Sequence, residues 1–287
     1  MQVWHRSLAR IRRMRSADAP PEAPTTRSSP AMGFPLEIVE MIIVHLIYDI
    51  RSLLACSLTC SSWYIAAVAH LHHTLTIHTH PYPWVPREKM WPRLLVHLHK
   101  LGLLPLVKKL RARCESYYGV REGCFPETFH RDTLHQLSSL ANLQELVIDY
   151  LNISEFIPSL QQHSGHFLPT LRSLVLQEPK CSRRQIIYFL GLFQHLEDLT
   201  LLFAPVPPSD FQGESTDEPT LTPFFTPPLR GRLTMRDSGV ELVKDMISLF
   251  GGLRFRYMDI IEVDGAWLLL DACAGTLETL RLYHKCA

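Results

Sequence analysis

The chain has 287 residues, of which 46% are apolar, and its 29 basic and 28 acidic residues leave a formal net charge of +1. A chain of this length buries a sizeable core without disulfides or metals, and a charge so near zero gives no whole-protein attraction to nucleic acid or to a membrane surface. The seven cysteines, an odd number, do not fit a disulfide framework and indicate a reducing compartment.

The first 32 residues are basic and then rich in proline. They contain six arginines, meet their first acid only at Asp18, and continue with four prolines among small polar residues. Such a composition buries too little surface to offset the entropy of ordering, so residues 1–32 are predicted to be a disordered basic tail. The alternative is a mitochondrial presequence, because Trp4, Leu8 and Ile11 recur at helical spacing among the arginines.

Residues 36–47 predict a helix of unusual composition. Pro35 suits a first turn, and only Glu37, Glu40 and His45 interrupt a run that is otherwise apolar. Such a helix is apolar around most of its circumference and must be buried on two sides. The run is also shorter than the roughly 20 residues of a membrane span, so we predict no membrane association.

Two further short helices are predicted to follow. Ser52 is placed to cap a helix over residues 53–58, and Ser61 or Ser62 caps a third. Three helices of this size form too small a core to use all their apolar surface, so the excess needs the rest of the chain or another protein. One continuous face of the third helix is formed by Trp63, Ala66, Ala67, His70 and Leu71.

Taken together, and in their order along the chain, the predicted turn and helices of residues 33–78 resemble an F-box. That family shows an apolar-Pro turn followed by Glu and an apolar residue, then spaced aliphatics, a Ser-Leu helix start and a Val/Cys-x-x-Trp ending. Phe34 stands where the family usually has Leu. The alternative is an ordinary buried helical subdomain. The resemblance is carried by Phe34-Pro35-Leu36-Glu37-Ile38, Ile42, Leu46, the segment from Ser52 to Leu58, Cys60 and Trp63.

The resemblance implies a partner and a function. F-box segments dock onto the Skp-type adaptor of cullin–RING ubiquitin ligases, while the rest of the chain holds a protein substrate. It therefore implies a substrate receptor of an SCF-type (Skp–cullin–F-box) ligase, acting in protein ubiquitination in the cytoplasm or nucleus. Leu46 and Trp63 are the members of the interface most expected to lie in the core. The residues implied to make or support the adaptor interface are Phe34, Pro35, Leu36, Ile38, Ile42, Leu46, Leu53, Leu58 and Trp63.

Beyond a linker at residues 79–103, residues 104–287 repeat a template of the form apolar-x-x-Leu-x-x-Leu-x-apolar. Consecutive copies start between 23 residues (227 to 250) and 36 residues (104 to 140) apart. One copy, over residues 250–258, is defective because Arg256 falls on its third apolar position. The copies end in Leu110/Ala112, Leu146/Ile148, Leu174/Leu176, Leu199/Leu201, Leu280/Leu282 and, more weakly, Leu233/Met235.

This pattern resembles leucine-rich repeats, whose period is about 20–29 residues. Each Leu-x-apolar is expected to form a short strand, with helices over residues 183–192 and 240–250. The predicted fold is α/β, a three-helix F-box followed by a curved leucine-rich-repeat-like solenoid, interrupted by an acidic, proline-rich loop at residues 204–228. The alternative is an ordinary α/β domain with leucine-rich strands. Because no polar unit follows the last strand, we expect a partner or further chain at that end.

No catalytic motif accompanies these repeats. The histidines at positions 70, 72, 73, 78 and 80 have no thiolate or carboxylate among them to complete a zinc site, so we predict no metal, no cofactor and no catalytic residue. An enzyme of another type would need a deep pocket with convergent polar groups. A second alternative is a repeat scaffold in which the N-terminal helices only cap the solenoid. No charge stripe or aromatic row identifies the substrate.

Overall fold

The computed structural model describes residues 34–78, 96–113, 140–150, 153, 168–179, 181–193, 195–203, 228–249 and 252–283. They belong to two compact units, residues 1–67 and 68–287. The predicted basic tail, residues 79–95 of the predicted linker and residues 204–227 of the predicted acidic loop lie outside the described residues. Within the described ranges, every helix is too short or too polar to cross a membrane.

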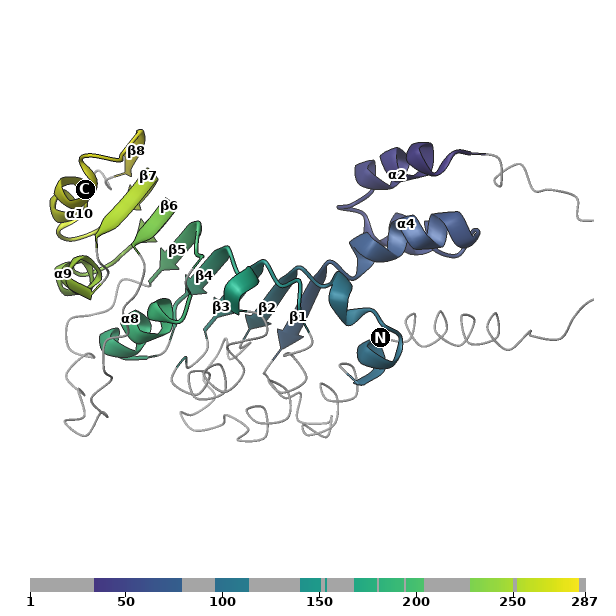
Figure 1. The fold of residues 1–287 in the computed structure, drawn as a ribbon, viewed down its shortest axis with the longest axis horizontal. Coiled ribbons are helices and arrows are strands. Elements are labelled where there is room, and N and C mark those ends of the chain that lie inside the picture. The colour runs from purple at the N-terminus through teal and green to yellow at the C-terminus, as the bar shows by residue number, and fades with distance from the viewer. Residues whose placement is uncertain are drawn as a thin grey trace, which may run out of the picture. The chain divides into compact units, whose positions relative to one another are not determined.

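The first unit contains helices α2 (Leu36–His45) and α3 (Ile50–Cys56) and the start of α4 (Ser61–Leu71) (Figure 1). The prediction for α3 was wrong in its start and in its cap. Asp49, not Ser52, caps the helix, because its carboxylate accepts from the backbone N–H groups of Arg51 at 3.0 Å and Ser52 at 3.3 Å. Ser52 lies in the first turn and donates its hydroxyl to the same carboxylate.

In the second unit the described strands form one parallel sheet of eight, and their order in the sheet follows the chain (Figure 1). The predicted α/β class is confirmed. The first strand comes from residues that the sequence analysis placed with the helices. The strands are β1 (Thr74–His78), β2 (Lys109–Arg113), β3 (Glu145–Asp149), β4 (Ser173–Gln177), β5 (Asp198–Leu202), β6 (Leu229–Arg236), β7 (Leu253–Ile261) and β8 (Thr279–Tyr283).

The register stacks equivalent side chains across the sheet. Because side chains alternate between the two faces of a strand, each short strand gives two residues to the core, such as Leu174 and Leu176 of β4. Pairing places them beside the two core residues of the next strand. The first ladder is Leu75, Leu110, Leu146, Leu174, Leu199, Leu233, Met258 and Leu280, and the second is Ile77, Ala112, Ile148, Leu176, Leu201, Met235, Ile260 and Leu282. All are buried except the two in β8.

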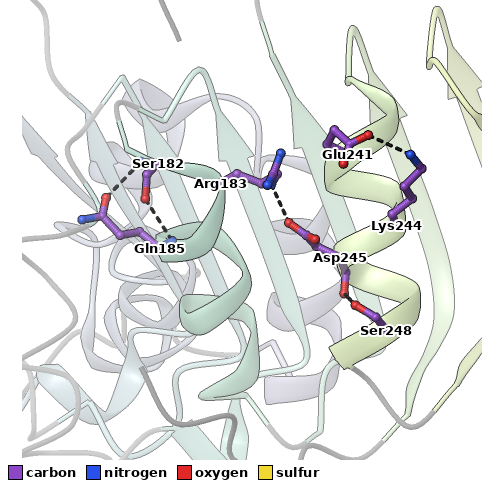
Figure 2. Close-up of polar contacts among 7 residues, drawn as sticks. All are labelled: Ser182, Arg183, Gln185, Glu241, Lys244, Asp245 and Ser248. Carbon is purple, nitrogen blue, oxygen red and sulfur yellow. Dashed lines mark hydrogen bonds and ion pairs between the residues drawn. The ribbon is translucent and has the colours of Figure 1, made fainter. Parts of the chain in front are cut away.

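Helices pack on this face of the sheet and complete the core. They are α8 (Arg183–Gly191), α9 (Val240–Leu249) and α10 (Ala266–Cys273), and the first two agree with the helices expected there. A capping box between Ser182 and Gln185 begins α8. The Arg183 Nε atom lies 2.5 Å from Asp245 Oδ2, which joins α8 to α9 (Figure 2). The short 3-10 turns η3 (Leu104–Leu106) and η6 (Leu168–Thr170) precede β2 and β4.

The residue after a strand repeatedly adopts the left-handed conformation. Tyr150, Glu178, Asp237 and Glu262 follow β3, β4, β6 and β7, with φ between 45° and 58°. Each donates its backbone N–H to the last carbonyl of the next strand, at 2.7–3.3 Å. This conformation is unfavourable for residues with a Cβ, so its recurrence shows that the neighbouring strand holds each turn in the same way.

The sequence-based register of β7 was wrong. A bulge opposite Gly231 and Arg232 leaves Arg256 as an extra residue on β7. The core positions are therefore Met258 and Ile260, both buried, and Arg256 points away from the core. What the sequence presents as a defect in the repeat is a residue that the bulge excludes from it.

Gly231 is predicted to be essential to this bulge. Its φ is +92°, and a Cβ at this position would lie 2.0 Å from the Glu197 carbonyl oxygen. We expect Gly231→Ala to lower the free energy of unfolding by at least about 2 kcal/mol, from backbone strain and overlap together, measured by urea unfolding. Gly275→Ala is the matched control, because a Cβ there meets nothing within 4 Å. Equal urea midpoints of unfolding for the two variants would show that stability does not depend on the close approach of Gly231 to the Glu197 carbonyl oxygen.

Candidate docking surface

Helix α2 carries apolar side chains on both sides. Val39 and Ile43, one turn apart, are fully buried and form its inner face. Met41 lies two positions, or about 200° of helical rotation, from Val39, and Val44 also lies on the outer side. Both are at least half exposed. These two side chains lie outside the core that the described residues of the unit form.

The exposed apolar residues are concentrated in this region. Of the sixteen large apolar side chains that are clearly exposed in the described residues, ten fall between positions 34 and 65. Folded chains rarely leave so much apolar surface uncovered unless it binds something. We call these ten residues, which are 36–95% exposed, the apolar surface: Phe34, Leu36, Met41, Ile42, Val44, Ile47, Tyr48, Ile50, Leu58 and Ile65.

The nine residues that the resemblance implied for the adaptor interface divide into three groups. Phe34, Leu36, Ile42 and Leu58 belong to the apolar surface, and Pro35 is exposed at the start of α2. Half-buried positions are taken by Ile38, Leu46 and Trp63. Leu53 is buried in the core and supports the surface only from inside.

Six members of the apolar surface were missed by the sequence analysis. The missing signal was helical phase, which cannot be set until the buried pair Val39 and Ile43 is known. Once that pair defines the inner face, Met41 and Val44 must point outward. Tyr48 and Ile50 lie in or next to the turn between α2 and α3, where periodicity gives no prediction.

The turn between α2 and α3 is fixed by an aspartate. The hydroxyl of Ser52 donates to Asp49 Oδ2 at 2.6 Å, and two backbone N–H groups donate to Oδ1. The hydrogen bonds from Ser52 hold the pKa of Asp49 below its ordinary value, because they stabilise the charged form. The cap is therefore fully formed above the unfolded pKa and is lost as the pH falls through the folded one.

Polar groups at the start of α4 contact one another. Cys60 Sγ lies 3.2 Å from Ser62 Oγ, and this contact, with the backbone N–H of Trp63, lowers the pKa of the thiol. No acid or histidine in the described residues contacts it. The indole Nε1 of Trp63 is buried and has no acceptor among the described residues. Trp63 thus packs by its ring rather than by a polar contact.

The described histidines of the predicted cluster lie on helix α4, in the turn after it and at the end of β1. His70 lies on α4, while His72 and His73 follow it before β1. Burial lowers the pKa of both His72 and His73, and Lys108 adds to the effect at His73, so both are neutral near pH 7. His80 lies outside the described residues. Across the described ranges, no three histidine, cysteine or acidic side chains are grouped to hold a metal ion.

No family model matches the chain, and a search of curated proteins finds no match.

The hydrogen bonds to Asp49 lead to a prediction about the titration of its carboxyl group. In the folded chain, the carboxyl of Asp49 should titrate below its ordinary 3.8, as followed by the carboxyl-carbon chemical shift in NMR. Ser52→Ala should raise this midpoint toward 3.8, because it removes the shortest hydrogen bond to the carboxylate. Ser57→Ala is the control, since Ser57 donates to the Leu54 carbonyl instead. An unchanged midpoint in Ser52→Ala would contradict the assigned cause.

Proposed function

We propose that the chain is the substrate-receptor subunit of an SCF-type ubiquitin ligase. In this proposal residues 33–78 form an F-box that docks onto a Skp-type adaptor and through it a cullin. The α/β unit, a leucine-rich-repeat-like solenoid, binds a protein substrate. The chain contributes no catalytic residue, and partner subunits carry out ubiquitin transfer in the cytoplasm or nucleus.

The observation that carries the proposal is the exposure of residues within the F-box-like pattern. Phe34, Leu36, Ile42 and Leu58 are positions of that pattern, and each exposes a large apolar side chain. A helix that lies in a partner's groove is expected to present such a face. Full burial of an aliphatic side chain contributes about 1.5–3 kcal/mol, so burial of the exposed parts of these side chains against a partner would favour docking.

Three observations support the repeat interpretation of the α/β unit. The strands pair in chain order, all parallel, and the same two core positions recur along the sheet. The left-handed residue after the strand recurs with the same hydrogen bond. A stack in which each unit contacts only its neighbours has these properties.

The alternative is a scaffold in which α2 to α4 cap the repeats and bind no adaptor. It requires the apolar surface to be covered by the chain's own second unit in solution. The receptor proposal instead requires the surface to be available to the adaptor. Binding to a Skp-type adaptor therefore distinguishes the two.

Co-expression of the full chain with a Skp-type adaptor, followed by size-exclusion chromatography, tests the proposal. Wild type should elute as a one-to-one complex. Leu36→Asp with Ile42→Asp should weaken binding by about 100-fold or more, because two apolar contacts are replaced by charges that must be desolvated. Both residues are exposed, so the free chain should remain folded.

Two controls make the result specific. Val96→Asp places the same charge on a side chain that is as exposed as Ile42, 37% in each case, but lies in the other unit, and it should leave the complex intact. Circular dichroism checks that each variant is folded. A folded wild type that does not bind the adaptor would favour the scaffold and would contradict a role in ubiquitination.

A further inference from the structure

The outward face of β6 and β7 carries a cluster of arginines. On β6 the exposed Arg230 and Arg232 alternate with core positions, and on β7 Arg254 and the bulge residue Arg256 are exposed. We call these four residues the arginine cluster. The bulge places Arg256 on this face, which is why the sequence alone does not show the cluster.

Two of the arginines are directly opposed. Arg230 pairs with Arg254 in the register of β6 and β7, and neighbouring strands lie about 4.8 Å apart. Like charges at opposed positions repel each other and destabilise a sheet. Neither guanidinium has an ion pair or hydrogen bond with another described residue. Their placement is therefore unfavourable for the fold by itself.

The pair also projects beyond its neighbouring strands. β5 pairs with β6 only from Arg232 onward, and β8 pairs with β7 only from Tyr257 onward. The segments 229–231 and 253–255 thus form a two-stranded extension of the sheet. Its inner side is anchored by the buried Leu229, Leu253 and Phe255, which leaves the outer side open.

The same face is arranged differently at the other end of the sheet. There Lys109 is opposite Glu145, with Nζ 2.6 Å from Oε1, and Arg111 reaches Asp149 at 2.5 Å. Two cations of β2, Lys109 and Arg111, are thus neutralised by acids of β3.

Around the arginine cluster the acids are fewer and farther away. Asp198 is opposite Arg232 in the register but forms no ion pair with it, and Glu278 is 3.7 Å from Arg256. The cluster therefore keeps a net positive charge of about two when these two acids are counted. Clusters of one sign attract ligands of the opposite sign.

One aromatic residue completes the surface. Tyr257 is 41% exposed, and the guanidinium carbon of Arg232 lies 5.8 Å from the centre of its ring. This contact restrains the arginine, and the exposed part of the ring offers an apolar contact beside the charges. A ligand that fits has closely spaced anionic groups on a chain with some apolar surface.

We propose that the arginine cluster binds an acidic polypeptide segment, with carboxylates bridging Arg230 and Arg254. Guanidinium groups hold carboxylates through paired hydrogen bonds. A peptide is favoured over nucleic acid because the positive area is small and the chain as a whole is nearly neutral. Acidic-segment binding does not depend on the adaptor. The interpretation of this binding as substrate recognition rests on the receptor function proposed above.

Fluorescence anisotropy with the full chain, in the absence of any adaptor, tests this. The probe is a fluorescein-labelled dodecapeptide of alternating Glu and Ser, compared with the same peptide carrying Gln for Glu. We expect the Glu peptide to bind and the Gln peptide not to bind. Arg230→Ala with Arg254→Ala should raise the dissociation constant at least tenfold. The control pair Arg51→Ala and Arg184→Ala, which are exposed arginines elsewhere with the same change in net charge, should raise it less than twofold.

Two further measurements separate binding from structure. The melting temperature of the Arg230→Ala, Arg254→Ala variant should equal or exceed that of wild type, because the substitution relieves a repulsion. Affinity of wild type for the Glu peptide should fall as NaCl is raised from 50 to 300 mM.

The proposal is overturned if the Glu and Gln peptides bind alike, or if the two double variants behave alike. It is equally overturned if the Arg230→Ala, Arg254→Ala variant melts well below wild type. Tighter binding of a 20-nucleotide single-stranded DNA through the same arginines would also overturn it. Since no adaptor is present, none of these results depends on the F-box interpretation.

Discussion

The stacking of apolar side chains in two continuous ladders is the interaction on which the α/β unit depends. A strand of five residues such as β4 gives only Leu174 and Leu176 to the core, too little to bury by itself. Its neighbours supply equivalent residues in register on either side, so each strand is stabilised by the next. Because the inner face stabilises the sheet, the residues of the outer face can vary, from the ion pairs between β2 and β3 to Arg230 and Arg254, which have no ion pair with another described residue.

In the helical unit, by contrast, many apolar side chains lie outside the core. Its three short helices bury few residues, with Val39, Ile43 and Leu53 at the centre, and no stacked neighbour of the same kind lies among the described residues. The apolar side chains that remain outside, such as Met41 and Val44, do not stabilise the unit. Polar residues there would increase solubility without weakening the core, and the proposed contact with a partner would account for their apolar character.

Sequence pattern predicts what is periodic and misses what depends on phase or register. The Leu-x-apolar pairs of β2 to β5 were located because strand side chains alternate strictly. Strict alternation does not hold across the bulge in β7, because one extra residue shifts every later side chain to the other face of the strand. That shift misplaced Arg256 and hid the arginine cluster. Likewise, Asp49 was passed over as a cap in favour of Ser52, since both residue types suit that position.

The arginine cluster shows how a rigid sheet makes an unfavourable charge arrangement usable. Hydrogen bonding between β6 and β7 fixes the backbone of Arg230 and Arg254, so a ligand spends little binding energy on ordering the main chain. The guanidinium groups are exposed to solvent, which limits the affinity and makes it sensitive to salt. A surface with these properties would bind acidic segments quickly and release them readily, as the proposed receptor function would require.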